Sequence, residues 1–293
     1  MYRFFVQPSD VLGETITLSS GDSEHIRSLR LRPSELFVVC DGNGTDYICR
    51  LAEKPKPQES SGSRKRADGG INQARSGRSE APVSNRKSRA GNEPGDTAAP
   101  GRRDRATTAT EALIVASSPT RGEPAVDCAM FIAYAKGDRL DYAVQKTVEL
   151  GAHSIRLFPC ARSIAVPEDS GNRIARMQKI AAEAAKQCGR GRIPVVSAAC
   201  SFEDAVSDAS QAILPLFLYE SEEELTLRSA LESRSGAATV SIFTGPEGGF
   251  EEEEAQLARR LGMLSVTLGP RVLRCETAPV AALSAIMYHY GNL

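Results

Sequence analysis

A strand, a glycine turn and a helix start follow one another in the segment Ser241-Ile242-Phe243-Thr244-Gly245-Pro246-Glu247-Gly248-Gly249-Phe250-Glu251. The apolar run predicts a strand, and the glycines allow a close approach of the backbone to a ligand. In an α/β protein such a turn lies at the carboxyl edge of the sheet, where ligands bind. We therefore predict a ligand site at this turn. The alternative is a tight turn that only leads into a charged surface helix.

The acidic start of the following helix indicates which ligand the turn can accept. Glu247 and the run 251–254 place carboxylates where a pyrophosphate would need positive potential. The segment also lacks a G-x-G-x-x-G pattern and a Walker lysine. A cofactor without phosphate and with a positive centre, such as the sulfonium of S-adenosylmethionine, fits this turn better than a nucleotide.

Strands and helices alternate from residue 129 onward, which predicts an α/β domain with a mainly parallel sheet. Strands are expected at 129–135, 154–158, 212–219, 239–244 and 264–268. Helices are expected at 138–150, 172–188, 251–261 and 277–290.

A second loop carries two arginines and a glutamate in the run Leu268-Gly269-Pro270-Arg271-Val272-Leu273-Arg274-Cys275-Glu276. The Gly-Pro pair forces a turn, and Thr277 is expected to cap the next helix. The loop should therefore hold its charged side chains beside the glycine turn. Salt bridges at the surface are the alternative role for these charges.

The first part of the chain has the pattern of a small β-barrel. Strands are expected at 14–18, 35–39, 46–51 and 111–116, with a short helix at 23–30. Between them, residues 54–108 hold 13 Lys and Arg against 6 Asp and Glu, and only Ile71 and Val83 among larger apolar residues. Such a segment cannot form a core, so we predict a disordered basic insert. It serves either as a solvated linker or as an arm attracted to RNA phosphates.

Composition argues against several other classes. The seven cysteines are scattered without a close C-x-x-C pair, and no motif joins the three histidines, so no metal site is predicted. No apolar run approaches the roughly 18 residues of a membrane span, and the N-terminus has no signal-peptide pattern. We expect a cytoplasmic protein with no membrane association.

Several ordered motifs make the sequence similar to a known family. They are Arg3-Phe4-Phe5, Lys136-Gly137-Asp138-Arg139, Glu183-Ala184-Ala185-Lys186-Gln187-Cys188-Gly189-Arg190, the glycine turn and the arginine loop. Together they closely resemble the RsmE-type family, the 16S ribosomal RNA uridine-N3 methyltransferases of the SPOUT class. The resemblance covers nearly the whole chain except residues 54–108.

The resemblance implies two domains and a dimer. Residues 1–125 would form a PUA-like RNA-binding β-barrel, interrupted by the insert at 54–108. Residues 126–293 would form a SPOUT-type α/β domain with a deep trefoil knot, a rare exception to the rules of chain connection. The family also implies a homodimer and, as partner, 16S ribosomal RNA in the small ribosomal subunit.

The site residues follow from the same resemblance. S-adenosyl-L-methionine would be bound by three loops, 216–221, 244–249 and 268–274. The cofactor-binding residues expected there are Leu216, Tyr219, Thr244, Gly245, Pro246, Glu247, Gly248, Gly249, Leu268, Gly269, Val272, Leu273 and Arg274. RNA contacts are expected from Arg3, His25, Arg30, Arg190 and Arg192.

Catalysis would be methyl transfer to N3 of an unpaired or extruded uracil. Arg274 is the candidate that orients the base or stabilises its developing negative charge, and Glu276 is a candidate proton acceptor. Two other functions stay open. One is a SPOUT enzyme that acts on transfer RNA or a ribose 2'-hydroxyl, and the other is a ribosome-associated RNA-binding protein without catalysis.

Overall fold

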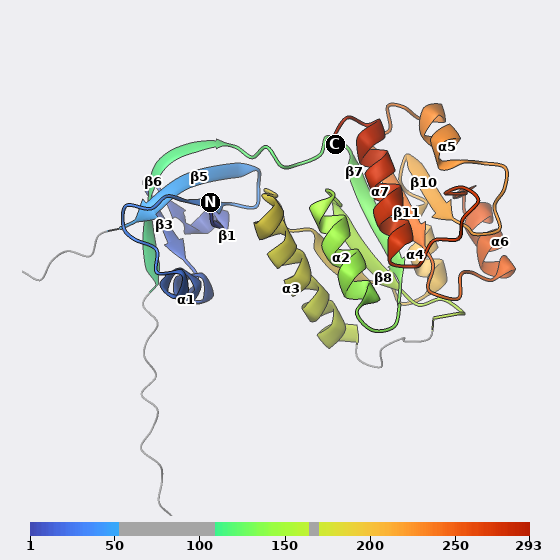
Figure 1. The fold of residues 1–293 in the computed structure, drawn as a ribbon, viewed down its shortest axis with the longest axis horizontal. Coiled ribbons are helices and arrows are strands. Elements are labelled where there is room, and N and C mark those ends of the chain that lie inside the picture. The colour runs from blue at the N-terminus through green and yellow to red at the C-terminus, as the bar shows by residue number, and fades with distance from the viewer. Residues whose placement is uncertain (53–108, 164–169) are drawn as a thin grey trace, which may run out of the picture. The chain divides into compact units, whose positions relative to one another are not determined.

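The computed structural model describes residues 1–52, 109–163 and 170–293. Two six-stranded sheets and helices make up a mixed α/β fold in these residues (Figure 1). The predicted basic insert at 54–108 lies outside the described residues, so the structure does not test it.

The N-terminal sheet has the strand order β1-β4-β5-β6-β3-β2. Its pairs are antiparallel except for the parallel pair β1 and β4. In that order the strands are Arg3–Phe5, Phe37–Cys40, Thr45–Leu51, Thr110–Pro119, Thr15–Leu18 and Val11–Leu12. The short helix η1 (Pro8–Asp10) precedes β2. Phe4, Ile16 and Phe37 are buried at the centre of its core.

Helix α1 (Ser20–Leu29) packs with this sheet and begins three residues before the predicted start. The hydroxyl of Ser19 accepts a hydrogen bond from the amide of Asp22, and this cap sets the first turn. The helix ends at Arg30, whose φ of 54° lies in the left-handed region.

A mainly parallel sheet was predicted, and the C-terminal sheet is parallel throughout, with the order β12-β10-β11-β7-β8-β9. In that order the strands are Leu264–Val266, Leu214–Leu218, Thr239–Thr244, Asp127–Ala133, Ser154–Phe158 and Val195–Ala198. The predicted bounds of β8 and β11 are confirmed. Because β11 lies between β10 and β7, the glycine turn after it leaves the middle of the sheet.

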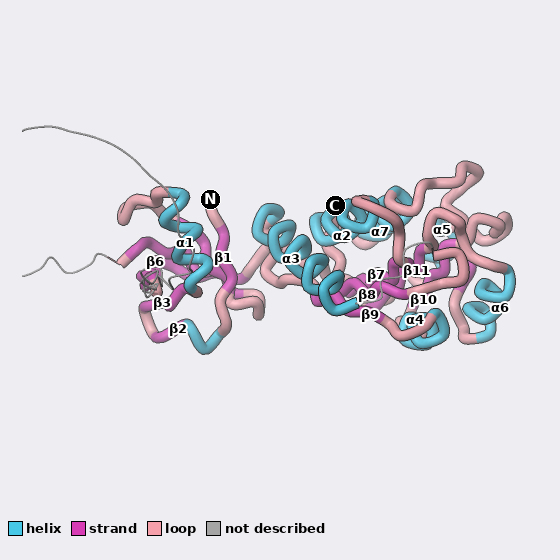
Figure 2. The backbone as a smooth tube through the Cα atoms, turned by 90° about the horizontal axis from the view of Figure 1, so that it is seen from below, coloured by secondary structure: helices cyan, strands magenta, loops and turns pink. Residues whose placement is uncertain are grey.

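Helices cover both faces of the parallel sheet (Figure 2). Helices α2 (Arg139–Glu149), α3 (Ser170–Cys188) and α7 (Thr277–His289) lie on one face, and α4 (Phe202–Ala209) and α6 (Glu252–Arg260) on the other. Strand β7 alternates accordingly, with Met130 and Ile132 in the first core and Phe131 and Ala133 in the second.

In the N-terminal sheet, β1, β2 and η1 were not predicted. In the C-terminal region three short elements were not predicted: β9, α4 and α5 (Leu227–Ser233). The signal for the two helices lay in their caps. The hydroxyl of Ser201 accepts from the amide of Asp204, and that of Thr226 accepts from the amide of Ser229. Their apolar patterns are too short for periodicity to reveal them.

Helix α7 follows the edge strand β12, yet it packs beside α2 over the central strands β7 and β11 (Figure 1). The connecting loop therefore crosses from the edge to the centre of the sheet. The prediction that Thr277 caps α7 is wrong. The helix begins at Thr277, and Glu276 at the cap position already has helical angles, φ −80° and ψ −22°.

Within 1–52, 109–163 and 170–293, no helix has the length and apolar character needed to cross a membrane.

Candidate active site

A cavity of about 960 Å³ lies at the carboxyl ends of β10, β11 and β12. Because these strands are parallel neighbours, the loops that follow them meet at one edge of the sheet. The cavity is lined mainly by residues 218–223, 244–249 and 266–276, together with Arg139 at the start of α2. The two loops singled out in the sequence therefore form one site.

Packing between the loops explains the glycine at position 249. Gly249 has a φ of +67°, and a Cβ placed there would overlap Oε1 of Glu220. The same Glu220 oxygen accepts a hydrogen bond from the amide of Phe250 at 3.3 Å. A side chain at 249 would therefore displace the carboxylate that joins the loop after β10 to the glycine turn.

The N-terminus of α6 is closed by its own side chains, as the acidic run predicted. Glu251 and Glu254 form a capping box, in which each carboxylate accepts an amide of the other residue's backbone. Glu252 and Glu253 add charge to the first turn. A phosphate would find these amides occupied and the potential unfavourable, so the site suits a ligand without phosphate.

Arg139 joins the glycine turn to the arginine loop. Its Nη1 donates to Oε1 of Glu247 at 2.6 Å, and its Nε lies 3.8 Å from Oε2 of Glu276. Although burial works in the opposite direction, the amide of Lys136 and the guanidinium of Arg139 lower the pKa of Glu247. Glu247 is therefore an anion that ties the turn to the start of α2.

Cys275 is a neutral thiol inside the cavity. Burial, together with the nearby carboxylates Glu276 and Glu247, raises the pKa of Cys275 to about 12. Its Sγ donates to Oε2 of Glu276 at 3.3 Å. Since the thiolate is the nucleophilic form of cysteine, Cys275 is not suited to attack a substrate near neutral pH.

The cavity gathers twelve of the thirteen predicted cofactor residues, and both predicted catalytic residues, Arg274 and Glu276. Those twelve are Tyr219, Thr244, Gly245, Pro246, Glu247, Gly248, Gly249, Leu268, Gly269, Val272, Leu273 and Arg274. Leu216 is the exception. Strand β10 continues to Leu218, so Leu216 is fully buried in the core of the sheet, and we withdraw it from the site.

The arginine loop exposes its two arginines and the valine after the first of them. Arg271 and Arg274 are exposed, and within the described part of the chain no ion pair holds either of them. Val272, between them, is 85% exposed. Two cations at the mouth of the cavity are thus free to meet a polyanion.

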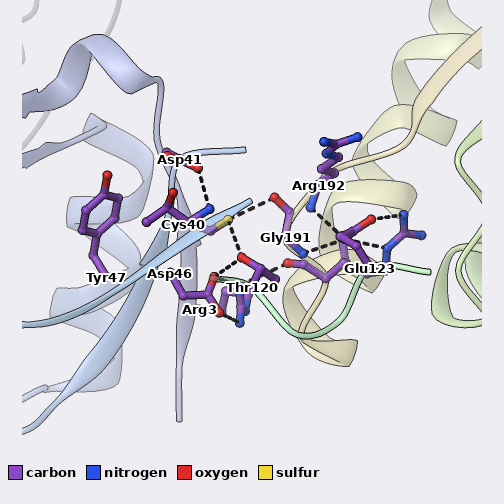
Figure 3. Close-up of polar contacts among 12 residues, drawn as sticks. Arg3, Cys40, Asp41, Asp46, Tyr47, Thr120, Glu123, Gly191 and Arg192 are labelled. Carbon is purple, nitrogen blue, oxygen red and sulfur yellow. Dashed lines mark hydrogen bonds and ion pairs between the residues drawn. The ribbon is translucent and has the colours of Figure 1, made fainter. Parts of the chain in front are cut away.

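Two predicted RNA contacts, Arg3 and Arg190, are instead enclosed within the fold, and Figure 3 shows Arg3 beside Asp46. Arg3 pairs with Asp46 at 2.6 Å and also donates to the carbonyl of Arg190. The Arg190 side chain is only 4% exposed and donates to both carboxylate oxygens of Glu123 and to the carbonyls of Val148 and Ala152. We therefore withdraw both arginines from the RNA contacts.

The other three predicted RNA contacts are accessible. His25 and Arg30 are exposed on α1 and at its end. Arg192 is exposed as well, and only its main-chain amide donates to Glu123, while Figure 3 shows its guanidinium pointing away from that carboxylate. These residues remain candidates for binding RNA.

Sequence reasoning missed Arg139 and Glu222 as site residues, and it covered Glu220 only as part of the loop 216–221. Arg139 follows β7, the sheet neighbour of β11, so its place beside the glycine turn depends on strand order. Glu220 and Glu222 follow β10 directly, and that position was a usable signal. No group of three or more His, Cys, Asp or Glu side chains in the described residues could hold a metal ion.

Comparison with known proteins identifies the class to which this site belongs. Residues 122–287 match the family described as RNA methyltransferase domain. The chain is 37% identical over 160 residues to Ribosomal RNA small subunit methyltransferase E of Bacillus subtilis, and the match covers 52% of this chain. This chain spans 62% of the length of that relative.

Two further relatives match almost the whole chain. Ribosomal RNA small subunit methyltransferase E of Synechocystis is 26% identical over 287 residues, which cover 97% of this chain and 77% of that protein. A crystal structure of Ribosomal RNA small subunit methyltransferase E from Neisseria gonorrhoeae, bound to S-adenosyl methionine, has 25% identity and a TM-score of 0.69. That alignment covers 98% of this chain and 97% of the other.

The family match extends over more than half of the chain and includes the strand, glycine turn and arginine loop that form the cavity. The resemblance found in the sequence is therefore confirmed, and the chain belongs to the RNA methyltransferase family, as a relative of the RsmE-type ribosomal RNA small subunit methyltransferases.

Proposed function

We propose that this protein uses S-adenosylmethionine to methylate N3 of a specific uridine in 16S ribosomal RNA of the small subunit. The observation that carries the proposal is the single cavity in which the glycine turn and the arginine loop meet. The family membership and the names of the relatives support it.

The cavity fits S-adenosylmethionine in size and charge. Its volume of about 960 Å³ lies within the range of small-molecule sites. Residues 218–223, 244–249 and 268–273 would hold the cofactor, with Glu220, Glu222 and Glu223 providing an acidic wall beside a cationic ligand. When bound, the cofactor supplies an electrophilic methyl group on a sulfonium.

The arginine loop would act on the uracil. N3 of uracil carries a proton that must leave, and negative charge then develops on the base. Arg274, exposed at the mouth of the cavity, would orient the base and stabilise this charge. Glu276 would accept the proton directly or through water, and Arg139 beside it would fix its position.

The target nucleotide must reach the cavity in an unpaired or extruded form, because base pairing occupies N3. Arg271 would then contact the RNA backbone near the mouth of the cavity. His25, Arg30 and Arg192 are the accessible cations and donors that would bind RNA elsewhere on the molecule.

We extend the proposal to the fold. Residues 126–293 form a SPOUT-type trefoil knot, and residues 1–125 form a PUA-like RNA-binding barrel. The path from β12 to α7, which returns over β7 and β11, supports a threaded C-terminal segment. The six-stranded N-terminal sheet with its own core supports the barrel.

We also propose a homodimer that packs through α7. This helix has no charged residue before His289, and Tyr288 is 76% exposed. Tyr142, on the neighbouring α2, is 48% exposed. A surface helix that is apolar on every side needs a cover. Sedimentation equilibrium at micromolar concentration should give twice the mass of one chain, and a monomer mass would refute the dimer.

The decisive experiment supplies the purified protein with S-adenosylmethionine and either small subunits or naked 16S ribosomal RNA that lacks the modification. Mass spectrometry of the nucleosides should find N3-methyluridine. Arg274→Ala should lower the single-turnover rate by about 100-fold while cofactor affinity changes only a few-fold. A methylated ribose, modification of transfer RNA alone, or no product at all would overturn the proposal.

A further inference from the structure

Arg259, on the last turn of α6, contacts the wall of the cavity from outside it. Its Nε donates to Oγ of Ser265 at 3.0 Å, and its Nη2 lies 3.6 Å from Oε2 of Glu222. Its guanidinium carbon lies 5.5 Å from the centroid of the Tyr219 ring. Tyr219 and Glu222 both line the cavity, so Arg259 touches two residues of the wall without being part of it.

Glu222 connects Arg259 to the main chain of the cavity wall. Its Oε1 accepts the amides of Glu224 at 3.1 Å and Leu225 at 3.4 Å, while its Oε2 faces Arg259. The carbonyl of Leu225 accepts the amide of Thr267 at 2.9 Å, just before the arginine loop. The Glu222 carboxylate therefore stabilises the turn at 222–225, and this turn is hydrogen-bonded to the residue that follows β12.

Tyr219 is also linked to Arg259 indirectly, through hydrogen bonds to Glu252. The hydroxyl of Tyr219 donates to Oε2 of Glu252 at 2.8 Å, and Oε1 of Glu252 accepts from Nη1 of Arg259 at 3.5 Å. The aromatic ring and its hydroxyl are thus both held from the α6 side.

The negative charge of the wall favours a cation beside it. The run Glu220-Ser221-Glu222-Glu223-Glu224 places four carboxylates within five residues. Carboxylates this close repel one another and tend to open the turn. Among the described residues, Arg259 forms the ion pair that reaches this run.

We infer that Arg259 is a positioning residue that holds residues 218–225 in the conformation that binds S-adenosylmethionine. It acts through Tyr219 and Glu222 and does not touch the ligand. This inference rests on the proposed function, since it assigns the wall to the cofactor. It predicts a change in cofactor affinity without a matching change in turnover.

The test compares the full chain with Arg259→Ala, Arg259→Lys and Arg260→Ala. Arg260 is the matched control, because it is exposed on the same last turn. Calorimetry with S-adenosylhomocysteine gives Kd, and assays on small subunits give KM for S-adenosylmethionine and kcat. Arg259→Ala should raise Kd and KM about five- to tenfold and leave kcat within about twofold. Arg260→Ala should behave like the wild type.

The lysine variant should be intermediate. Lysine keeps a charge near Glu222, but it has no planar fork that could also reach Ser265 and cover Tyr219. If Arg259→Ala does not fold, Arg259→Gln replaces it. Glutamine keeps a polar side chain on α6 but loses the ion pair with Glu222 and the cation over Tyr219, so Kd should rise in the same way.

The outcomes separate the two proposals. No binding of S-adenosylhomocysteine to the wild type would count against the proposed function. Binding by the wild type and equally by Arg259→Ala would overturn the inference alone. A fall in kcat with unchanged KM would also overturn it, because Arg259 would then act on the chemistry.

Discussion

Two arginines at opposite ends of α2 hold carboxylates in similar ways but in different surroundings. Arg190 pairs with Glu123 at 2.8 Å near the end of α2, and Arg139 pairs with Glu247 at 2.6 Å at its start. The Arg190 side chain is 4% exposed, whereas that of Arg139 is 41% exposed and lines the cavity. The surroundings of a cation, more than its partner, therefore distinguish a residue that holds the fold from a residue of the site.

The comparison predicts its largest effect for Arg190→Ala. The substitution leaves the Glu123 carboxylate without its bidentate partner and the carbonyls of Val148 and Ala152 without their donor. Removing one member of a buried ion pair costs about 3–5 kcal/mol. Urea denaturation should show this loss in the free energy of unfolding. A loss below about 1 kcal/mol would contradict the structural role of Arg190.

Arg139→Ala should have the opposite profile. Without Arg139, Glu247 and Glu276 lose the guanidinium that lies between them, so methylation should slow by about tenfold. The denaturation midpoint should hardly move, because half-exposed ion pairs contribute little to stability. Single-turnover assays and urea melts on one preparation measure both. A large shift of the midpoint with unchanged methylation would reverse the comparison.

The sequence was sufficient where the signal was local. The strand, glycine turn and helix start at 239–260 follow from apolar runs and glycines in continuous sequence, and the structure confirms them. It was insufficient where the partner is distant. Glu123 lies 67 residues from Arg190, so that arginine was indistinguishable from an exposed basic turn.

Arg139 shows the same limit of sequence reasoning for a residue that belongs to the site. It lies 108 residues from Glu247 in sequence, and only the insertion of β11 beside β7 brings the two together. Leu216 is a different case: the strand expected at 212–219 already contained it, and its burial within β10 removes it from the loop 216–221 that the resemblance implied.

Low pH should also distinguish the Arg190–Glu123 pair from the Arg139–Glu247 pair, but by a smaller effect than the two substitutions above. The pKa of Glu123 is lowered: burial alone would raise it, but Arg190 and the amides of Gly191 and Arg192 outweigh that effect. A carboxyl with a lowered folded pKa stabilises the fold above its unfolded pKa, and this stability is lost as pH falls through the folded value. Unfolding free energy should therefore decrease below about pH 4.5. The dependence of unfolding free energy on pH should be flatter for Glu123→Gln than for Glu247→Gln, because Arg190 and two amides hold the Glu123 carboxylate inside the fold. Equal slopes for the two variants would contradict this ranking.

The smallest effect is expected for Arg192→Ala, two residues from Arg190. The Arg192 side chain is exposed, and its amide would still donate to Glu123 after the substitution. Unfolding free energy should change by less than about 0.5 kcal/mol. If Arg192 contacts a phosphate, RNA affinity should weaken most at low salt, and the slope of log affinity against log salt should flatten by about 0.7 to 1. Arg260→Ala, equally exposed on α6, is the control and should leave the slope unchanged. An identical slope for wild type and Arg192→Ala would remove Arg192 from the RNA contacts, as burial has already removed Arg190.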